Sequence, residues 1–268
     1  MKNILVIFVT ILSLAAIVVG KIHWDQKIEA KAEVNLQTST TDDEPLVEDG
    51  EVEIDPIIIE EKMKLTKNLP VDVSKKIEAA LNDGHQIDLV IMGSSDTPKE
   101  DGWPTLVKEE ITNKYGEVIK VTIKEIDDKT STEILEEDLH KDIVELQPDI
   151  LLLEPFILYD NGKVRMEHRL ENLTDILDDF YEENPDLTVM IQPANPLYNA
   201  VHYPREVDEL KRYAEKNELV YIDHWEAWPD QQSEKIKDYL NDSVPNEEGH
   251  RLWADYILNT FISDDTSN

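Results

Sequence analysis

Two serines, Ser94 and Ser95, come directly after the apolar run "IDLVIMG". The run is typical of a buried strand, and Gly93 permits a tight exit from it, so both hydroxyls are expected where the strand ends. A serine at such a turn can act as a nucleophile, with backbone N–H groups nearby to hold an oxyanion. Ser95 or Asp96 can instead be a simple helix cap. The turn can therefore hold either a catalytic serine or a helix cap.

A serine nucleophile needs a base, and the histidines are the first candidates. His250 lies early in the helix-like segment "PNEEGHRLWADYILNTF", on its apolar face at the 3.6-residue period. His224 ends the apolar run "LVYIDH" and is the alternative acid or base. A histidine in either place can equally be a core residue whose ring nitrogens are satisfied.

A carboxylate must orient the imidazole of a catalytic histidine. Asp242 precedes the last helix-like segment by a few residues, and we take it as the orienting acid. Glu247 lies three residues before His250 on the same helical face and is the alternative. The chain has 59 acidic residues, so composition alone places an acid near any histidine.

Composition excludes several kinds of function. The formal net charge is −33, which opposes binding to nucleic acid and to anionic lipid headgroups. The absence of cysteine excludes disulfides, thiolate catalysis and cysteine-based zinc sites. The sequence has no HExxH-type histidine spacing, no Walker loop and no GxGxxG, so we predict neither a metal nor a cofactor.

Five apolar runs alternate with helix-like segments between residues 71 and 264, which predicts an α/β domain with a mostly parallel sheet. The runs are "IDLVIMG", "EVIKVTIKEI", "PDILLLEP", "LTVMIQPA" and "LVYIDH". In such sheets the site lies beyond the carboxyl ends of the strands. That rule selects residues 94–95, 154–161, 192–199 and 223–228, and the start of the last helix at 243–250 can join them.

The N-terminus predicts a membrane anchor within residues 1–21. An uncharged run from Ile4 to Gly20, about 17 residues long, lies between Lys2 and Lys21, at the short edge of the ~17–25 residues of a spanning helix. No cleavage site lies directly after it, which favours an uncleaved anchor with the domain outside the cell membrane over a cleaved signal and a secreted protein. Residues 22–70 read as an acidic flexible tether, within which "PIIIEEKMKL" can form a short strand or helix that docks on the domain, and 265–268 read as a short tail.

Three segments in order resemble the SGNH/GDSL hydrolase superfamily. "VIMGSSDT" is similar to its strand followed by Gly-Asp-Ser, which places Ser94 at the Asp and Ser95 at the nucleophile. "PDILLLEPFILYDNG" resembles the block that ends near Gly-x-Asn-Asp, and "DSVPNEEGHRLWADYI" the block in which Asp-x-x-His precedes Pro-Asn. The resemblance implies a three-layer α/β/α, flavodoxin-like fold with a mostly parallel five-stranded sheet, and a serine esterase, lipase or carbohydrate O-acetyl esterase.

The last two blocks depart from the family pattern. Val244 stands where the histidine is expected and Asn241 where the aspartate is expected. The oxyanion asparagine of the second block falls near Tyr159, so Asn161 and Asn195 are possible replacements, beside the turn at Gly93 and Ser94. His250 is the nearest histidine in the last block.

The resulting hypothesis is a membrane-anchored extracytoplasmic ester hydrolase of a bacterial cell envelope. Its substrate would be a small ester or an acylated glycan. The alternative is a catalytically inactive module of the same fold that binds envelope glycans or acyl groups, with Trp103, Trp225 or Trp228 as stacking surfaces. The sequence predicts no oligomeric state.

Overall fold

The computed structural model describes residues 55–263. The predicted anchor, the first part of the predicted tether and the predicted tail lie outside these residues. Within the described part of the chain, no helix is long and apolar enough to cross a membrane.

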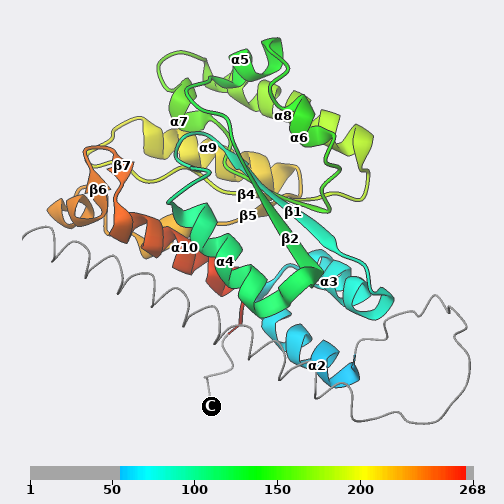
Figure 1. Cartoon of the computed structure of the whole chain (residues 1–268). Coiled ribbons are helices and arrows are strands. Elements are labelled where there is room, and N and C mark those ends of the chain that lie inside the picture. Colours follow the sequence, from blue (N-terminus) through cyan, green and yellow to red (C-terminus); the bar gives the residue numbers. More distant parts are fainter. Residues whose placement is uncertain (1–54, 264–268) are drawn as a thin grey trace, which may run out of the picture. The chain divides into compact units, whose positions relative to one another are not determined.

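A five-stranded parallel sheet forms the centre of the domain, in the order β2-β1-β3-β4-β5 (Figure 1). The strands are β1 (Ile87–Gly93), β2 (Ile119–Glu125), β3 (Ile150–Leu153), β4 (Thr188–Ile191) and β5 (Val220–Tyr221). All five lie within the predicted apolar runs. This strand order is the flavodoxin-like doubly wound order, which places the carboxyl ends of β1, β3 and β4 side by side.

Helices cover both faces of the sheet, giving the three-layer α/β/α architecture that was predicted (Figure 1). One layer holds α3 (Val71–Asp83), α4 (Trp103–Tyr115) and α10 (Glu247–Phe261). The other holds α5 (Ser131–Glu136), α6 (Lys141–Val144), α8 (Met166–Glu183) and α9 (Tyr203–Lys216). In β1 and β3, alternate apolar residues enter opposite cores, so both strands are mostly apolar and buried on both faces, apart from Asp88 near the start of β1.

The segment "STEILEEDLHKDIVELQ", residues 131–147, has a continuous helix-like pattern, and the structure divides it into α5 and α6. The backbone of Asp138, between the two, is left-handed at φ 55°, and Leu139 N–H bonds back to the Ile134 carbonyl. A left-handed residue ends an α-helix. The short helix α7 (Ile157–Asp160) and the two-strand hairpin of β6 (Leu240–Asn241) and β7 (Val244–Pro245) were not predicted.

The predicted tether extends too far toward the domain. Residues Pro56–Leu65 form α2, and Thr66–Asn68 continue it as a 3-10 turn, η1. Ile59, Met63 and Leu65 pack against the buried core, and Lys62 Nζ donates to the Tyr115 carbonyl at 2.9 Å. Packing of this apolar side onto the core stabilises a helix within residues that composition alone presents as part of a solvated tether.

Candidate active site

Ser94 is a buried anchor at the end of β1. Its Oγ donates to Glu154 Oε2 at 2.6 Å, and its backbone N–H donates to the same oxygen at 2.8 Å. Glu154 directly follows β3 and is fully buried. A Cβ on Gly93 would lie 2.3 Å from Thr97 Oγ1 and 2.8 Å from Glu154 Oε2, so a glycine is needed for this close approach. Ser94 therefore fixes the turn, and its hydroxyl is not available as a nucleophile.

Ser95 is the half-buried serine of the pair, and its hydroxyl meets two other loops. Its Oγ donates to Asp127 Oδ1, in the loop that follows β2. The side chain of Tyr159, in α7 after β3, is its other contact. Within the described residues the Ser95 backbone N–H makes no hydrogen bond, so it can donate to a ligand oxygen. Of the two serines that follow β1, Ser95 is therefore the partly accessible one, and Ser94 is buried.

Two buried carboxyl groups lie beneath Ser95. Burial, reinforced by the charge of Asp96, raises the pKa of Glu154 well above its ordinary value. Burial raises the pKa of Asp96 to about 6. Glu154 Oε1 has no hydrogen-bond partner in the described part of the chain. Burial thus favours the protonated form of Glu154, and ionisation of Asp96 at neutral pH comes at a cost in stability.

His250 caps a helix in this structure. Its Nδ1 accepts the backbone N–H of Trp103, the first residue of α4, at 3.3 Å. The N-cap residue Gly102 has no side chain to do this, and a Cβ there would lie 2.3 Å from Pro98 Cγ. An Nδ1 that accepts leaves the proton of the neutral ring on Nε2. Burial lowers the pKa of His250, which keeps the ring neutral as this contact requires.

The capping contact predicts that His250→Ala lowers the free energy of unfolding by about 0.5–2 kcal/mol, because one amide of the first turn of α4 loses its acceptor. His250→Gln, which can present an amide oxygen to the same N–H, should recover part of the loss. Urea unfolding at pH 7.5 measures both changes. Equal stability of His250→Ala and the wild type would show that the ring does not cap the helix.

His224 is held in the core by both ring nitrogens. Its Nε2 donates to the Pro193 carbonyl at 2.9 Å, and its Nδ1 accepts the indole N–H of Trp228 at 3.1 Å. Its ring stacks on Trp253 at 4.2 Å between centroids. Burial lowers the pKa of His224 to about 3. The alternative assignment of His224 as the acid or base does not agree with this geometry, because neither nitrogen is free.

The predicted orienting acids do not meet His250 in the structure. Asp242 is exposed at the tip of the β6–β7 hairpin, with φ 57°. Glu247 pairs with Arg251 at 3.0 Å on the outer side of α10. Val244, at the position where the family has its histidine, is 54% exposed. The predicted arrangement of Ser95, His250 and Asp242 is therefore not assembled in the described residues.

The predicted oxyanion asparagines have other surroundings. Asn195 is buried, and its Nδ2 donates to the carbonyl of Ser243 at 3.0 Å and to that of Pro196 at 3.2 Å. These bonds use the amide donors to tie the loop after β4 to the hairpin. Asn161 ends α7 and is half-buried. Tyr159, two residues earlier in the chain, is the side chain that reaches Ser95.

Asp127 is the site residue that the sequence analysis missed. The strand-end rule was not applied to the second apolar run. Pairing of Gly93 with Glu125 places the ends of β1 and β2 level, and Ile126 N–H donates to the Gly93 carbonyl at 2.8 Å. The residue that follows Ile126 is thereby brought to the turn at Ser95. The signal was available, because parallel neighbours end at the same sheet edge.

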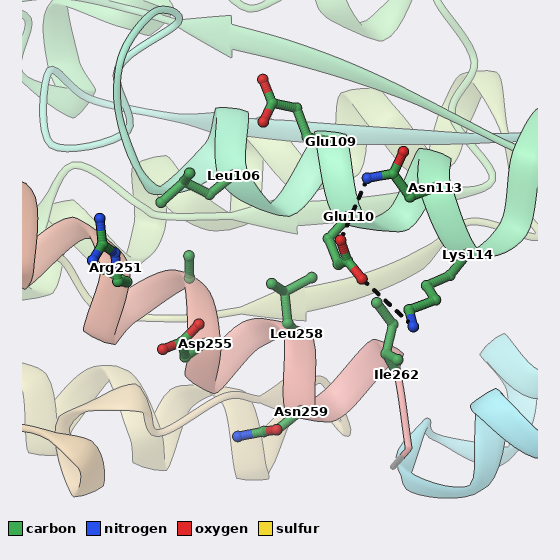
Figure 2. A pocket seen from close by; sticks show the side chains of 11 residues that line it. Leu106, Glu109, Glu110, Asn113, Lys114, Arg251, Asp255, Leu258, Asn259 and Ile262 are labelled. Carbon is green, nitrogen blue, oxygen red and sulfur yellow. Dashed lines mark hydrogen bonds and ion pairs between the residues drawn. The ribbon is translucent and has the colours of Figure 1, made fainter.

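A groove lies elsewhere, between α4 and α10 (Figure 2). It has a volume of about 630 Å³, with Leu106 and Leu258 among its apolar lining and Glu110 and Lys114 at its rim. The site residues Ser95, Asp127 and Tyr159 do not line it. Its position along two helices separates it from the polar groups at the strand ends.

Comparison with known proteins supports the fold assignment. No protein-family model matches the chain, and no curated protein sequence does. A G-D-S-L family protein from Desulfitobacterium hafniense DCB-2 superposes with a TM-score of 0.54 at 17% identity, covering 65% of this chain and 99% of that one. A carbohydrate esterase of family 3 from Talaromyces cellulolyticus gives 0.55 at 16% identity, covering 65% and 95%.

A third solved structure, a catalytic mutant of an acetylxylan esterase from Geobacillus stearothermophilus, gives a TM-score of 0.50 at 15% identity. It covers 65% of this chain and 94% of that chain. The parallel sheet with helices on both sides agrees with these matches. The chain therefore has the SGNH/GDSL hydrolase fold.

Proposed function

We propose that this protein is a serine ester hydrolase whose nucleophile is Ser95. The observation that carries the proposal is that the two adjacent serines differ in their contacts and accessibility. Ser94 is fixed to buried Glu154, whereas Ser95 is half-buried at the sheet edge, and its backbone N–H has no partner among residues 55–263. A nucleophile needs a fixed turn and an accessible oxygen, and this turn supplies both.

The substrate class that fits is a small ester or an acetylated sugar. The esterases and the G-D-S-L family protein that share the fold support this class by analogy, since fold alone does not fix a reaction. The reaction has two steps: Ser95 takes the acyl group and releases the alcohol, and water then releases the acid from the acyl-enzyme.

The protein is further proposed to act outside the cytoplasm, held by its first 21 residues. The uncharged run from Ile4 to Gly20 motivates this location. Protease added to intact cells should then remove the domain, and complete protection of the domain in unbroken cells would contradict the location.

The test of the activity is turnover of 4-nitrophenyl acetate and of an acetylated monosaccharide by the purified full-length chain in detergent. Hydrolysis of either ester above the rate of the heat-unfolded protein is expected. A folded protein that turns over neither ester would contradict the proposal.

The absence of turnover would favour the second candidate, a binding module of the same fold. One observation supports that candidate: exposed Val244 occupies the family position of the histidine, while His250 is engaged with Trp103. The aromatic surfaces for such a role are limited, because Trp103 is fully buried and Trp228 is 7% exposed. Trp225 is half-buried, and its indole N–H donates to the Ala194 carbonyl at 2.7 Å.

A further inference from the structure

The surroundings of the Ser95 hydroxyl come from the first three strands of the chain. Ser95 follows β1, Asp127 follows β2, and Tyr159 lies in α7 after β3. In the sheet order β2-β1-β3, these three strand ends are immediate neighbours with Ser95 in the middle. The two flanking side chains therefore approach the hydroxyl from opposite sides of its own strand.

Asp127 is placed as a proton acceptor by backbone contacts. The Ile126 N–H donates to the Gly93 carbonyl at 2.8 Å, one residue before Ser94. The Lys99 N–H donates to Glu125 Oε2 at 2.9 Å, which ties the far side of the serine loop to the end of β2. Between these two ties, Asp127 Oδ1 accepts the hydrogen bond of the Ser95 hydroxyl. A base must lie within hydrogen-bond reach of the proton that it removes, and Asp127 meets this condition.

Tyr159 is placed as a hydrogen-bond donor on the other side. Its side chain is half-buried and contacts Ser95. Burial raises the pKa of Tyr159, so its phenol keeps its proton at neutral pH. A neutral phenol can donate to an oxyanion, as the amide of an asparagine does in other sites. Tyr159 also lies near the position where the family resemblance leads one to expect that asparagine.

We propose that Asp127 is the general base for Ser95 and that Tyr159 donates to the oxyanion, in a site that uses no histidine. This inference rests on the proposed ester hydrolysis and names its proton acceptor and its donor. In the described residues neither imidazole bonds to Ser95: His224 uses both ring nitrogens in structural contacts, and Nδ1 of His250 accepts the Trp103 N–H.

The reaction balances with these groups alone. The Ser95 oxygen bonds to the carbonyl carbon, and its proton passes to Asp127 Oδ1. The carbonyl oxygen becomes an oxyanion that accepts from Tyr159 and from the Ser95 backbone N–H. Collapse of this intermediate expels the alcohol, which takes the proton from Asp127. Water then attacks the acyl carbon, gives its proton to Asp127, and the departing Ser95 oxygen recovers that proton.

The base strength of a carboxylate determines which kind of ester should react fastest. Carboxylates as a class are weaker bases than imidazole, so proton removal from a serine by a carboxylate is less favourable. Esters with good leaving groups, such as aryl acetates, should therefore react faster than alkyl esters of the same acid.

The test compares kcat for 4-nitrophenyl acetate among full-length variants. Asp127→Asn should lower kcat about 100-fold or more, the usual contribution of a general base. Tyr159→Phe should lower kcat by about 10- to 1,000-fold with little change in KM, because the donor acts on the transition state. The matched control is Asp128→Asn, the neighbouring exposed aspartate, whose left-handed backbone an asparagine tolerates. It should stay within about two-fold of the wild type.

The outcomes separate this inference from the proposed function. Loss of activity in Ser95→Ala with retention in Asp127→Asn would overturn the role of Asp127 and leave the serine hydrolase standing. Retained activity in Tyr159→Phe would overturn the role of Tyr159 as the donor to the oxyanion. A wild type that neither turns over ester nor reacts with a fluorophosphonate would overturn both proposals.

Discussion

Ser95→Ala is expected to lower kcat for 4-nitrophenyl acetate at least about a thousand-fold, because removing a serine nucleophile eliminates the acyl-enzyme route. The side chain is half-buried and bonds to exposed Asp127, so its removal leaves no buried group unpaired. The free energy of unfolding should therefore stay within about 0.5 kcal/mol of the wild type. Steady-state kinetics and urea unfolding of the same preparations measure the two quantities.

A matched control for Ser95→Ala is Ser243→Ala. Ser243 is exposed, and its backbone carbonyl, not its hydroxyl, accepts the hydrogen bond from Asn195. The control should keep full activity. Near wild-type turnover in Ser95→Ala would remove Ser95 from the mechanism.

Asp96→Asn is expected to become more stable relative to the wild type as the pH rises. Burial raises the pKa of Asp96 from 3.8 to about 6 in the folded protein. The stability that goes with its protonated form is present below pH 3.8 and is lost as the pH rises through 6. This difference in pKa corresponds to about 3 kcal/mol. An asparagine carries no charge at any of these pH values, so the variant avoids that loss.

The measured quantity is the difference in free energy of unfolding between Asp96→Asn and the wild type at pH 4 and pH 7.5. It should grow by about 2.4 kcal/mol in favour of the variant over this range, because at pH 4 the unfolded-state carboxyl is already partly ionised. His224, with its pKa lowered to about 3, makes both proteins less stable as the pH falls below 6.5, and it cancels in the difference. A difference that does not change with pH would show that Asp96 titrates as an exposed carboxyl does.

The centre of the sheet was predictable because β1, β3 and β4 are mostly buried on both faces. "IDLVIMG" became β1 without any change of bounds, since a largely apolar run that ends in Gly-Ser-Ser leaves little choice. The segment 131–147 was harder, because the left-handed turn at Asp138 interrupts a pattern that remains helical on both sides. For α2 the sequence left a docked strand or helix open and placed the segment within the tether, because the stability of this helix comes from packing on the core, which local composition does not encode.

The position of the site could be predicted from the sequence, but the residues that contact Ser94 and His250 could not. The turn at Ser94 and Ser95 lies where the strand-end rule placed it. Which serine is fixed depends on Glu154, and that contact joins residues 60 positions apart. His250 was taken from the sequence as a candidate base because it lies early in α10. The role of its ring as a cap for α4 depends on Gly102, which is distant in the sequence and has no side chain of its own.

The central claim is that Ser95 carries the acyl group, and covalent labelling tests it most directly. The full-length protein would be treated with a fluorophosphonate, digested with trypsin, and the peptide of residues 77–99 fragmented in a mass spectrometer. The account predicts one adduct per chain, located on Ser95 and absent from both Ser94 and the Ser95→Ala variant. A folded protein that forms no adduct, or an adduct on another residue that persists in Ser95→Ala, would contradict the claim.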